Sequence, residues 1–246
     1  MQVHFLGSYQ TPKVDCAASE CEDRYAICGA GSTFAISDGA SNSIFAGEWA
    51  QSLVDQFIAS PTTSINASWL RPATAALYSH VDFESLPWHG VAKFTRGVFA
   101  TLSGLFFDCQ SQRFSTVSIG DSVIVWRHLQ SGRAGMLPSM RSQDFERFPH
   151  LICHLPERNI GLFRRVRRRK SIKLPSGDTS FYLMTDALCH WYVSECERGR
   201  EPWQALCEIT SQDDFVDFIV HLRRENILKN DDTTLISLRV SVEKET

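Results

Sequence analysis

The chain has 246 residues, of which 43% are hydrophobic and 22% charged, with a formal net charge of -3. This composition is ordinary for a globular protein, and a chain of this length can build a core without disulfides. The charge argues against general binding of polyanions such as nucleic acid. No apolar stretch approaches the ~18 residues of a membrane helix, and the start lacks the regions of a signal peptide. We therefore expect a cytoplasmic protein without a membrane segment.

The eight cysteines contain no C-x-x-C pair, the spacing that often marks zinc ligands. Without a secretory signal, we expect reduced thiols that behave as small apolar residues. The cysteines therefore predict neither a disulfide framework nor a structural zinc site.

The first part of the chain reads as short strands and a polar loop, followed by two helices. We expect a strand over residues 33–37 and a turn over 39–43. Apolar residues then recur at helical spacing over 44–60, which predicts a helix. A second helix is expected over 66–81, with Pro72 near its first turn.

The middle of the chain is rich in strand patterns. Residues 94–107 resemble a strand pair, and residues 113–120 and 123–128 flank a Gly-Asp turn, which predicts a hairpin. Residues 136–156 are irregular.

The last part of the chain mixes strands and helices. Residues 164–174 alternate like a strand, and Gly177-Asp178 reads as a hairpin turn. The remaining elements are a strand over 181–184, helical segments over 188–197, 203–209 and 215–227, and a strand over 234–240. No regular strand-helix-strand rhythm appears, so we expect an α+β fold with helices on the faces of antiparallel sheets.

Four aspartates stand at the ends of strand-like runs. Asp38, Asp121 and Asp186 each follow such a run, and Asp231 precedes the last one. If the last strand runs antiparallel to its neighbours, we expect all four carboxylates to share one sheet edge. Taken alone, a residue such as Asp121 is more often a turn residue or helix cap, so the argument depends on the joint pattern.

Carboxylates gathered this closely would repel one another, and some would take up protons. Mg²⁺ or Mn²⁺ relieves this conflict, because both ions favour oxygen ligands. Two such ions roughly 3.5–4 Å apart can hold a hydroxide for in-line attack at phosphorus. The pattern therefore predicts a site for hard divalent cations.

At this point six motifs, in order, resemble the metal-dependent serine/threonine phosphatases of the PP2C (PPM) type, and more narrowly a bacterial branch of them. The motifs are Glu22-Asp23, Phe34-Ala-Ile-Ser-Asp-Gly39, Phe99-Ala-Thr-Leu102, Ser118-Ile-Gly-Asp-Ser122, Leu183-Met-Thr-Asp-Ala-Leu188 and Asn230-Asp-Asp-Thr-Thr-Leu235. They span nearly the whole chain. The resemblance implies one phosphatase domain over residues 1–246, built as an αββα sandwich of two antiparallel sheets flanked by helix pairs.

The resemblance also implies roles for the acids, with two or three Mn²⁺ or Mg²⁺ ions as cofactors. Asp38 matches the carboxylate that bridges two metals, and Gly39 offers its carbonyl to one of them. Asp186 and Asp231 match ligands of the other metal, and Asp121 matches a ligand of a third.

Two further acids and two departures complete the comparison with that family. Glu22 matches an acid that holds metal-bound water, and Asp23 is its neighbour. Ala18 stands where eukaryotic members carry a phosphate-gripping Arg, and Ala40 stands where they carry a general-acid His. Arg24 is the nearest cation to the missing Arg, and its direction is not readable from the sequence.

The resemblance implies hydrolysis of phosphoserine or phosphothreonine in a partner protein by a metal-bridging hydroxide. Family members of this branch often accompany a protein kinase and a von Willebrand A protein. The alternative is a catalytically weak regulatory module that acts through such a partner, which Ala18 and Ala40 favour. A more distant alternative is a phosphatase of small phosphate esters.

Two features stay open. The basic run Arg164–Lys170 fits either a contact for a phosphorylated or acidic partner or a solvated strand that resists edge pairing. His190 lies four residues after Asp186, and we expect it to pack or to face solvent rather than to bind a metal.

Overall fold

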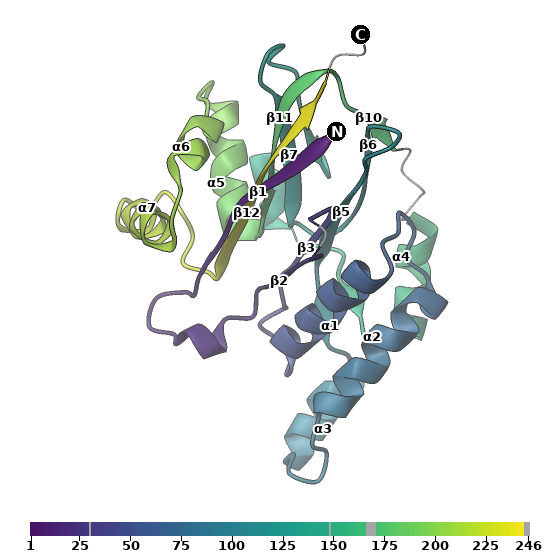
Figure 1. Ribbon diagram of the computed structural model, residues 1–246. Helices are drawn as coiled ribbons and strands as arrows, with labels where there is room; N and C mark the ends of the chain where they lie inside the picture. The colour runs from purple at the N-terminus through teal and green to yellow at the C-terminus, as the bar shows by residue number, and fades with distance from the viewer. Residues whose placement is uncertain (30, 148, 166–170, 244–246) are drawn as a thin grey trace.

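The computed structural model describes residues 1–29, 31–147, 149–165 and 171–243. Two five-stranded antiparallel sheets face each other at the centre, and helices cover their outer faces (Figure 1). One sheet has the strand order β1-β12-β11-β7-β8 and the other β10-β6-β5-β3-β2. The predicted α+β class and the αββα sandwich are confirmed.

The core between the sheets follows from the alternation of side chains along each strand. Phe34 and Ile36 point into it from β3, and Phe181 and Leu183 do so from β11. The first sheet comprises β1 (Gln2–Thr11), β7 (Val123–His128), β8 (Ala134–Leu137), β11 (Gly177–Met184) and β12 (Thr233–Val242). The second comprises β2 (Arg24–Ile27), β3 (Thr33–Ser37), β5 (Leu102–Asp108), β6 (Arg113–Ile119) and β10 (Ile172–Lys173), beside a small ladder of β4 (Phe99–Ala100) and β9 (Ile152–Cys153).

Helices pack on both outer faces. α1 (Ala46–Ala59) and α2 (Ala67–His80) cover the second sheet, and α5 (Asp186–Glu197) and α7 (Gln212–Arg224) cover the first. Shorter elements are α3 (Trp88–Arg96), α4 (Ile160–Arg165), α6 (Trp203–Glu208) and the 3-10 turns at 18–20, 142–146 and 156–159. No described helix has the length and apolar character that crossing a membrane requires.

The helix predictions are confirmed for the long, strongly periodic segments. The apolar face of α1, which includes Trp49, Leu53 and Phe57, packs against the second sheet. α2 begins where Asn66 caps it, because the Asn66 side chain accepts a hydrogen bond of 3.0 Å from the Trp69 backbone N–H.

The predicted hairpin over 113–128 is wrong. β6 and β7 belong to different sheets, and the chain crosses from one to the other at Gly120 and Asp121. Gly120 has a φ of +96°, a conformation that favours glycine. A Gly-Asp signal marks where the chain changes direction, but it does not say which strand each side pairs with.

Three smaller expectations are also wrong. Phe94 lies in the last turn of α3 rather than starting a strand, and its side chain packs into the core under α2. The strand expected over 164–174 is wrong at its start, where the residues up to Arg165 are helical. Residues 166–170 lie outside the described residues, and Ile172–Lys173 form strand β10 as expected. Asp178 is not in a turn: it pairs with Ser241 inside the first sheet and accepts a 2.7 Å hydrogen bond from its hydroxyl.

Candidate active site

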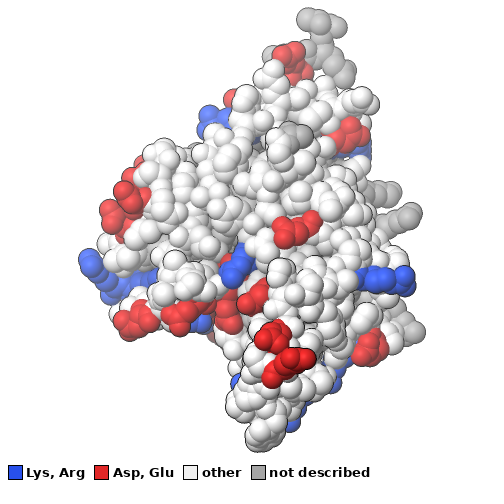
Figure 2. All heavy atoms as spheres, turned by 60° about the horizontal axis from the view of Figure 1, so that its bottom comes forward, with Lys and Arg blue, Asp and Glu red and all other residues white. Residues whose placement is uncertain are grey.

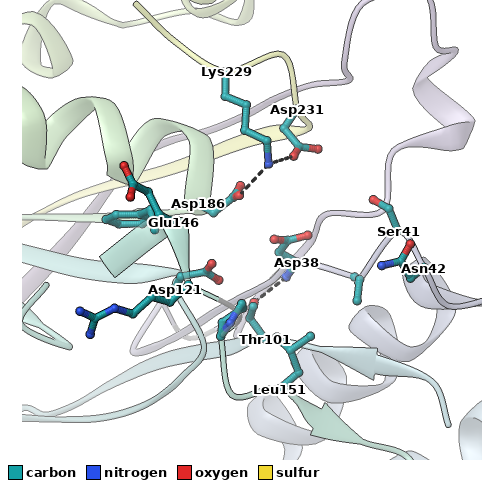
Figure 3. A pocket seen from close by; sticks show the side chains of 15 residues that line it. Asp38, Ser41, Asn42, Thr101, Asp121, Glu146, Leu151, Asp186, Lys229 and Asp231 are labelled. Atoms are coloured by element: carbon teal, nitrogen blue, oxygen red, sulfur yellow. Dashed lines mark hydrogen bonds and ion pairs between the residues drawn. The ribbon is translucent and has the colours of Figure 1, made fainter. Parts of the chain in front are cut away.

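The four strand-end aspartates line one pocket of about 340 Å³ at one end of the sandwich (Figure 3). Asp38 follows β3 in one sheet, while Asp186 and Asp231 lie at the ends of β11 and β12 in the other. β11 and β12 are antiparallel, which was the condition of that expectation, so the end of one strand lies beside the start of the next. The prediction of one shared sheet edge is wrong, because both sheets contribute and Asp121 lies where the chain crosses between them.

The loop that presents Asp38 is held by Thr101, a residue of the motif Phe99-Ala-Thr-Leu102 to which the sequence analysis assigned no role. The Asp38 N–H donates to Thr101 Oγ1 at 2.8 Å, and the Thr101 N–H donates to the Asp38 carbonyl at 2.8 Å. Gly39, which also lines the pocket, lets α1 start close by: a Cβ there would lie 2.6 Å from the backbone carbon of Ala46. Backbone geometry therefore fixes where the Asp38 carboxylate stands.

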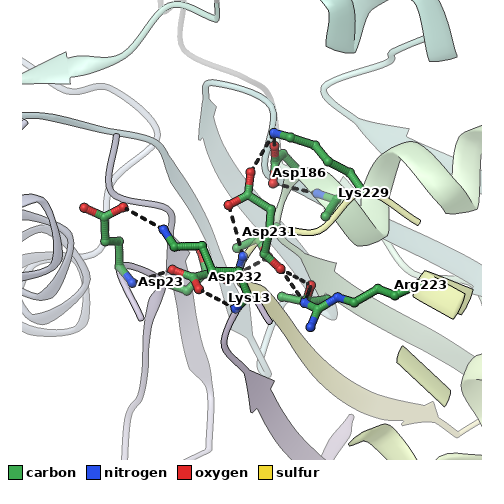
Figure 4. Close-up of polar contacts among 11 residues, drawn as sticks. Lys13, Asp23, Asp186, Arg223, Lys229, Asp231 and Asp232 are labelled. Carbon is green, nitrogen blue, oxygen red and sulfur yellow. Dashed lines mark hydrogen bonds and ion pairs between the residues drawn. The ribbon is translucent and has the colours of Figure 1, made fainter. Parts of the chain in front are cut away.

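A lysine ammonium lies between two of the predicted metal ligands. Lys229 Nζ is 2.6 Å from Asp231 Oδ2 and 3.6 Å from Asp186 Oδ2 (Figures 3 and 4). Asp186 is also oriented by its place at the start of α5, where its Oδ1 accepts a hydrogen bond from the Ala187 N–H at 2.6 Å. Sequence reasoning missed Lys229, although a cation two residues before a predicted ligand was a readable signal.

Asp23 lies beneath the pocket and does not line it. Its side chain is 1% exposed, and its Oδ2 accepts hydrogen bonds from the hydroxyls of Thr185 at 2.9 Å and Thr234 at 2.7 Å. Those threonines lie at the end of β11 and the start of β12. Asp23 therefore connects the segment just before β2 with the ends of β11 and β12 in the opposite sheet.

Glu22 is half-buried and also lies outside the pocket lining. Its carboxylate is 3.8 Å from Lys13 Nζ, and its backbone N–H donates to Asp232 Oδ2 at 2.7 Å. Asp232 in turn accepts from the Lys13 N–H at 3.0 Å (Figure 4). Asp232 thus holds the backbone of Lys13 and Glu22 in place and does not line the pocket.

The acids of the site share a strongly anionic environment. Burial, followed by the charges of Asp23 and Asp186, raises the pKa of Asp38 well above its usual range. Burial, followed by the Asp186 charge, raises the pKa of Asp121 to about 6. Burial also raises the pKa of Asp186, although Lys229 opposes this effect. Figure 2 shows acidic side chains gathered across the face turned toward the viewer there, with single basic side chains among them.

The donor set matches a hard divalent cation. Asp38, Asp121, Asp186 and Asp231 offer carboxylate oxygens, the ligands that Mg²⁺ and Mn²⁺ favour. Asp121 Oδ1 is buried and lacks a hydrogen-bond partner among the described residues, which a bound cation would satisfy. As the side chains stand, no three His, Cys, Asp or Glu of the described chain are arranged to hold an ion.

The two positions that depart from the family pattern, Ala18 and Ala40, lie in different surroundings. Ala18 is exposed in the first 3-10 turn and does not line the pocket, whereas Ala40 does. Arg24 does not replace the missing arginine, because its guanidinium donates to the backbone carbonyls of Cys21 and Asp23.

One wall of the pocket is formed by five residues close in sequence: Phe145, Glu146, Arg147, Pro149 and Leu151. The Phe145 ring packs on the ring of His190, with 5.4 Å between the ring centroids. His190 therefore packs against this wall instead of lining the pocket, as expected from the sequence. Part of the segment predicted to be irregular therefore borders the pocket.

The chain is similar to known proteins in its structure rather than in its sequence. No family model matches the chain, and no curated protein matches its sequence. The catalytic domain of the serine/threonine protein phosphatase PstP, in complex with two manganese ions, matches at 13% identity and a TM-score of 0.59, covering 98% of this chain and 100% of that one. The chain has the fold of a PP2C-type phosphatase domain.

Two further structures support the same fold. PppA, a regulatory component of the T6SS in Pseudomonas aeruginosa, matches at 18% identity and a TM-score of 0.56, covering 97% of each chain. RsbX in complex with magnesium matches at 15% identity and a TM-score of 0.51, covering 98% of this chain and 100% of the other. The resemblance stated from the motifs is therefore confirmed at the level of the fold.

Proposed function

We propose that this chain is a Mn²⁺- or Mg²⁺-dependent phosphatase that hydrolyses phosphoserine or phosphothreonine in a partner protein. The observation that supports this most is the meeting of four carboxylates, from both sheets, at one pocket of a PP2C-type fold. Two of the similar structures, PstP and RsbX, are complexes with manganese and with magnesium. We treat residues 1–246 as one such domain and place the activity in the cytoplasm.

Asp38, Asp121, Asp186 and Asp231 would hold the metal ions, together with the Gly39 carbonyl. When bound, divalent cations lower the pKa of coordinated water and screen the charge of a phosphoryl group. Thr101 keeps the Asp38 loop in place for this role through its 2.8 Å hydrogen bonds.

The acids beside the pocket have supporting roles in this proposal. Asp23 would keep the ends of β11 and β12 in register through its bonds to Thr185 and Thr234. Glu22 lies near Ser41, which lines the pocket, so Glu22 would order water at the pocket edge. Ala40 supplies no proton donor, and loss of a positioned acid typically costs about 10²–10⁴-fold in rate. We therefore expect slow turnover.

The test is hydrolysis of p-nitrophenyl phosphate and of a phosphothreonine peptide with Mn²⁺. The wild type is compared with an Asp38→Ala, Asp231→Ala double variant and with Asp217→Ala, which removes an exposed carboxylate on α7. We expect activity in the wild type and in Asp217→Ala and its loss in the double variant. Equal rates in all three proteins, each shown to be folded by circular dichroism, would refute the proposal.

A second candidate is a regulatory module that binds a partner without rapid turnover, such as a cognate protein kinase or von Willebrand A protein. The ion pairs of Lys229 with two predicted ligands favour it, as does the absence of a side-chain acid at Ala40. Calorimetric titration with Mn²⁺ separates the two candidates. Binding accompanied by hydrolysis supports the phosphatase, and binding without hydrolysis supports a sensor.

A further inference from the structure

Lys229 stands in an unusual place for a lysine, between the carboxylates of Asp186 and Asp231 at the pocket. Both carboxylates use their Oδ2 atoms for these contacts, at 3.6 Å and 2.6 Å. The only other basic residue among the described lining residues is Arg147, whose guanidinium lies 3.6 Å from Asp144. Lys229 is thus the cation that forms ion pairs with these two carboxylates (Figure 4).

The backbone around Lys229 is held independently of its ammonium. The Asp231 N–H donates to the Lys229 carbonyl at 3.0 Å. Arg223 donates to the carbonyls of Asp231 and Pro12 and to the Thr233 hydroxyl, which fastens this loop to its surroundings. The Lys229 side chain is 62% exposed, and its four-carbon stem is flexible. The ammonium can therefore turn toward solvent without any change in the backbone.

From this geometry we infer that the Lys229 ammonium and a divalent cation compete for Oδ2 of Asp186 and Asp231. The inference rests on the proposed metal dependence. A cation such as Mg²⁺ binds carboxylate oxygen at about 2.0–2.1 Å. The Lys229 ammonium already lies 2.6 Å from Oδ2 of Asp231. A cation bound to the same oxygen would lie close to the ammonium, and the two positive charges would repel each other. Lys229 therefore raises the metal concentration that is needed to fill this part of the site, because the metal must displace the ammonium from the two carboxylates.

The test measures Mn²⁺ binding by isothermal titration calorimetry, with the metal alone as ligand. The proteins are the wild type, Lys229→Met, Lys229→Gln and Lys229→Arg, with Lys93→Met as a matched control. Lys93 is exposed on α3, and no residue of α3 lines the pocket. Lys93→Met therefore changes the net charge as much as Lys229→Met does, but away from the site.

We expect Lys229→Met and Lys229→Gln to bind Mn²⁺ about tenfold more tightly than the wild type, which corresponds to about 1.4 kcal/mol. Lys229→Arg keeps a cation and should stay within about threefold of the wild type, as should Lys93→Met. Unchanged or weaker affinity in both neutral variants would overturn the inference while leaving the proposed phosphatase intact. Binding in the neutral variants alone would support the inference and contradict metal-dependent activity of the wild type. No binding by any protein would overturn both.

Discussion

Asp121 gives a sharp test of the electrostatics of the site. It is 8% exposed, and burial, followed by the charge of Asp186, raises its pKa to about 6 from an ordinary value of 3.8. The folded protein therefore keeps this proton to a higher pH than the unfolded chain does. Below about pH 4 both states are protonated, and the full stability is present. As the pH rises through 6, the folded state must accept a buried charge, and stability is lost.

The size of the effect follows from the two pKa values. They lie about two pH units apart, and each pH unit corresponds to about 1.4 kcal/mol, so ionised Asp121 costs about 3 kcal/mol. Asp121→Asn cannot ionise. Its free energy of unfolding, relative to the wild type, should therefore rise by about 3 kcal/mol between pH 4 and pH 7.5.

The assay is urea unfolding at pH 4, 5, 6 and 7.5 in the presence of EDTA, followed by tryptophan fluorescence. Asp217→Asn, on the exposed side of α7, is the control for removing a carboxylate, and it should follow the wild type at every pH. A difference between Asp121→Asn and the wild type that stays flat across this range, or that shrinks with pH, would refute the reasoning.

Two further predictions concern packing and the buried acid beneath the pocket. Gly104→Ala should destabilise the protein by about 1–3 kcal/mol, because a Cβ there would overlap the ring of Phe57 on α1; an unchanged urea midpoint would contradict this. Thr234→Val should cost about 1–3 kcal/mol, because it removes a 2.7 Å hydrogen bond to the buried Asp23 carboxylate. Thr234→Ser keeps the hydroxyl, so equal losses in thermal denaturation of the two variants would show that this bond is not the cause.

Local patterns were sufficient for the long helices and for locating the acids, but not for the short helices α3 and α4. The helix expected over 66–81 appears as Ala67–His80, since its cap at Asn66 and its apolar spacing are properties of neighbouring residues. Asp38 and Asp186 were found for the same reason, because each follows a buried strand whose end is visible in the sequence.

Pairing between distant strands was not readable in this way. Alternation predicted strands at 113–120 and 123–128, and both exist, yet they join opposite sheets. A period of two shows that a strand has a buried face, but β7 is buried along most of its length and could pair with several neighbours. The contact of Lys229 with Asp186 depends on this same long-range arrangement, through the loop that Arg223 fastens.

By itself, the sequence determined which residues are acidic strand ends and where the long, strongly periodic helices lie, because these depend on contacts within a few residues. Only the tertiary structure decided that the acids come from two sheets, that Asp23 lies beneath the pocket, and that Lys229 reaches between two carboxylates. These depend on which surfaces bury each other across nearly the whole chain, a choice that the packing of all layers makes together.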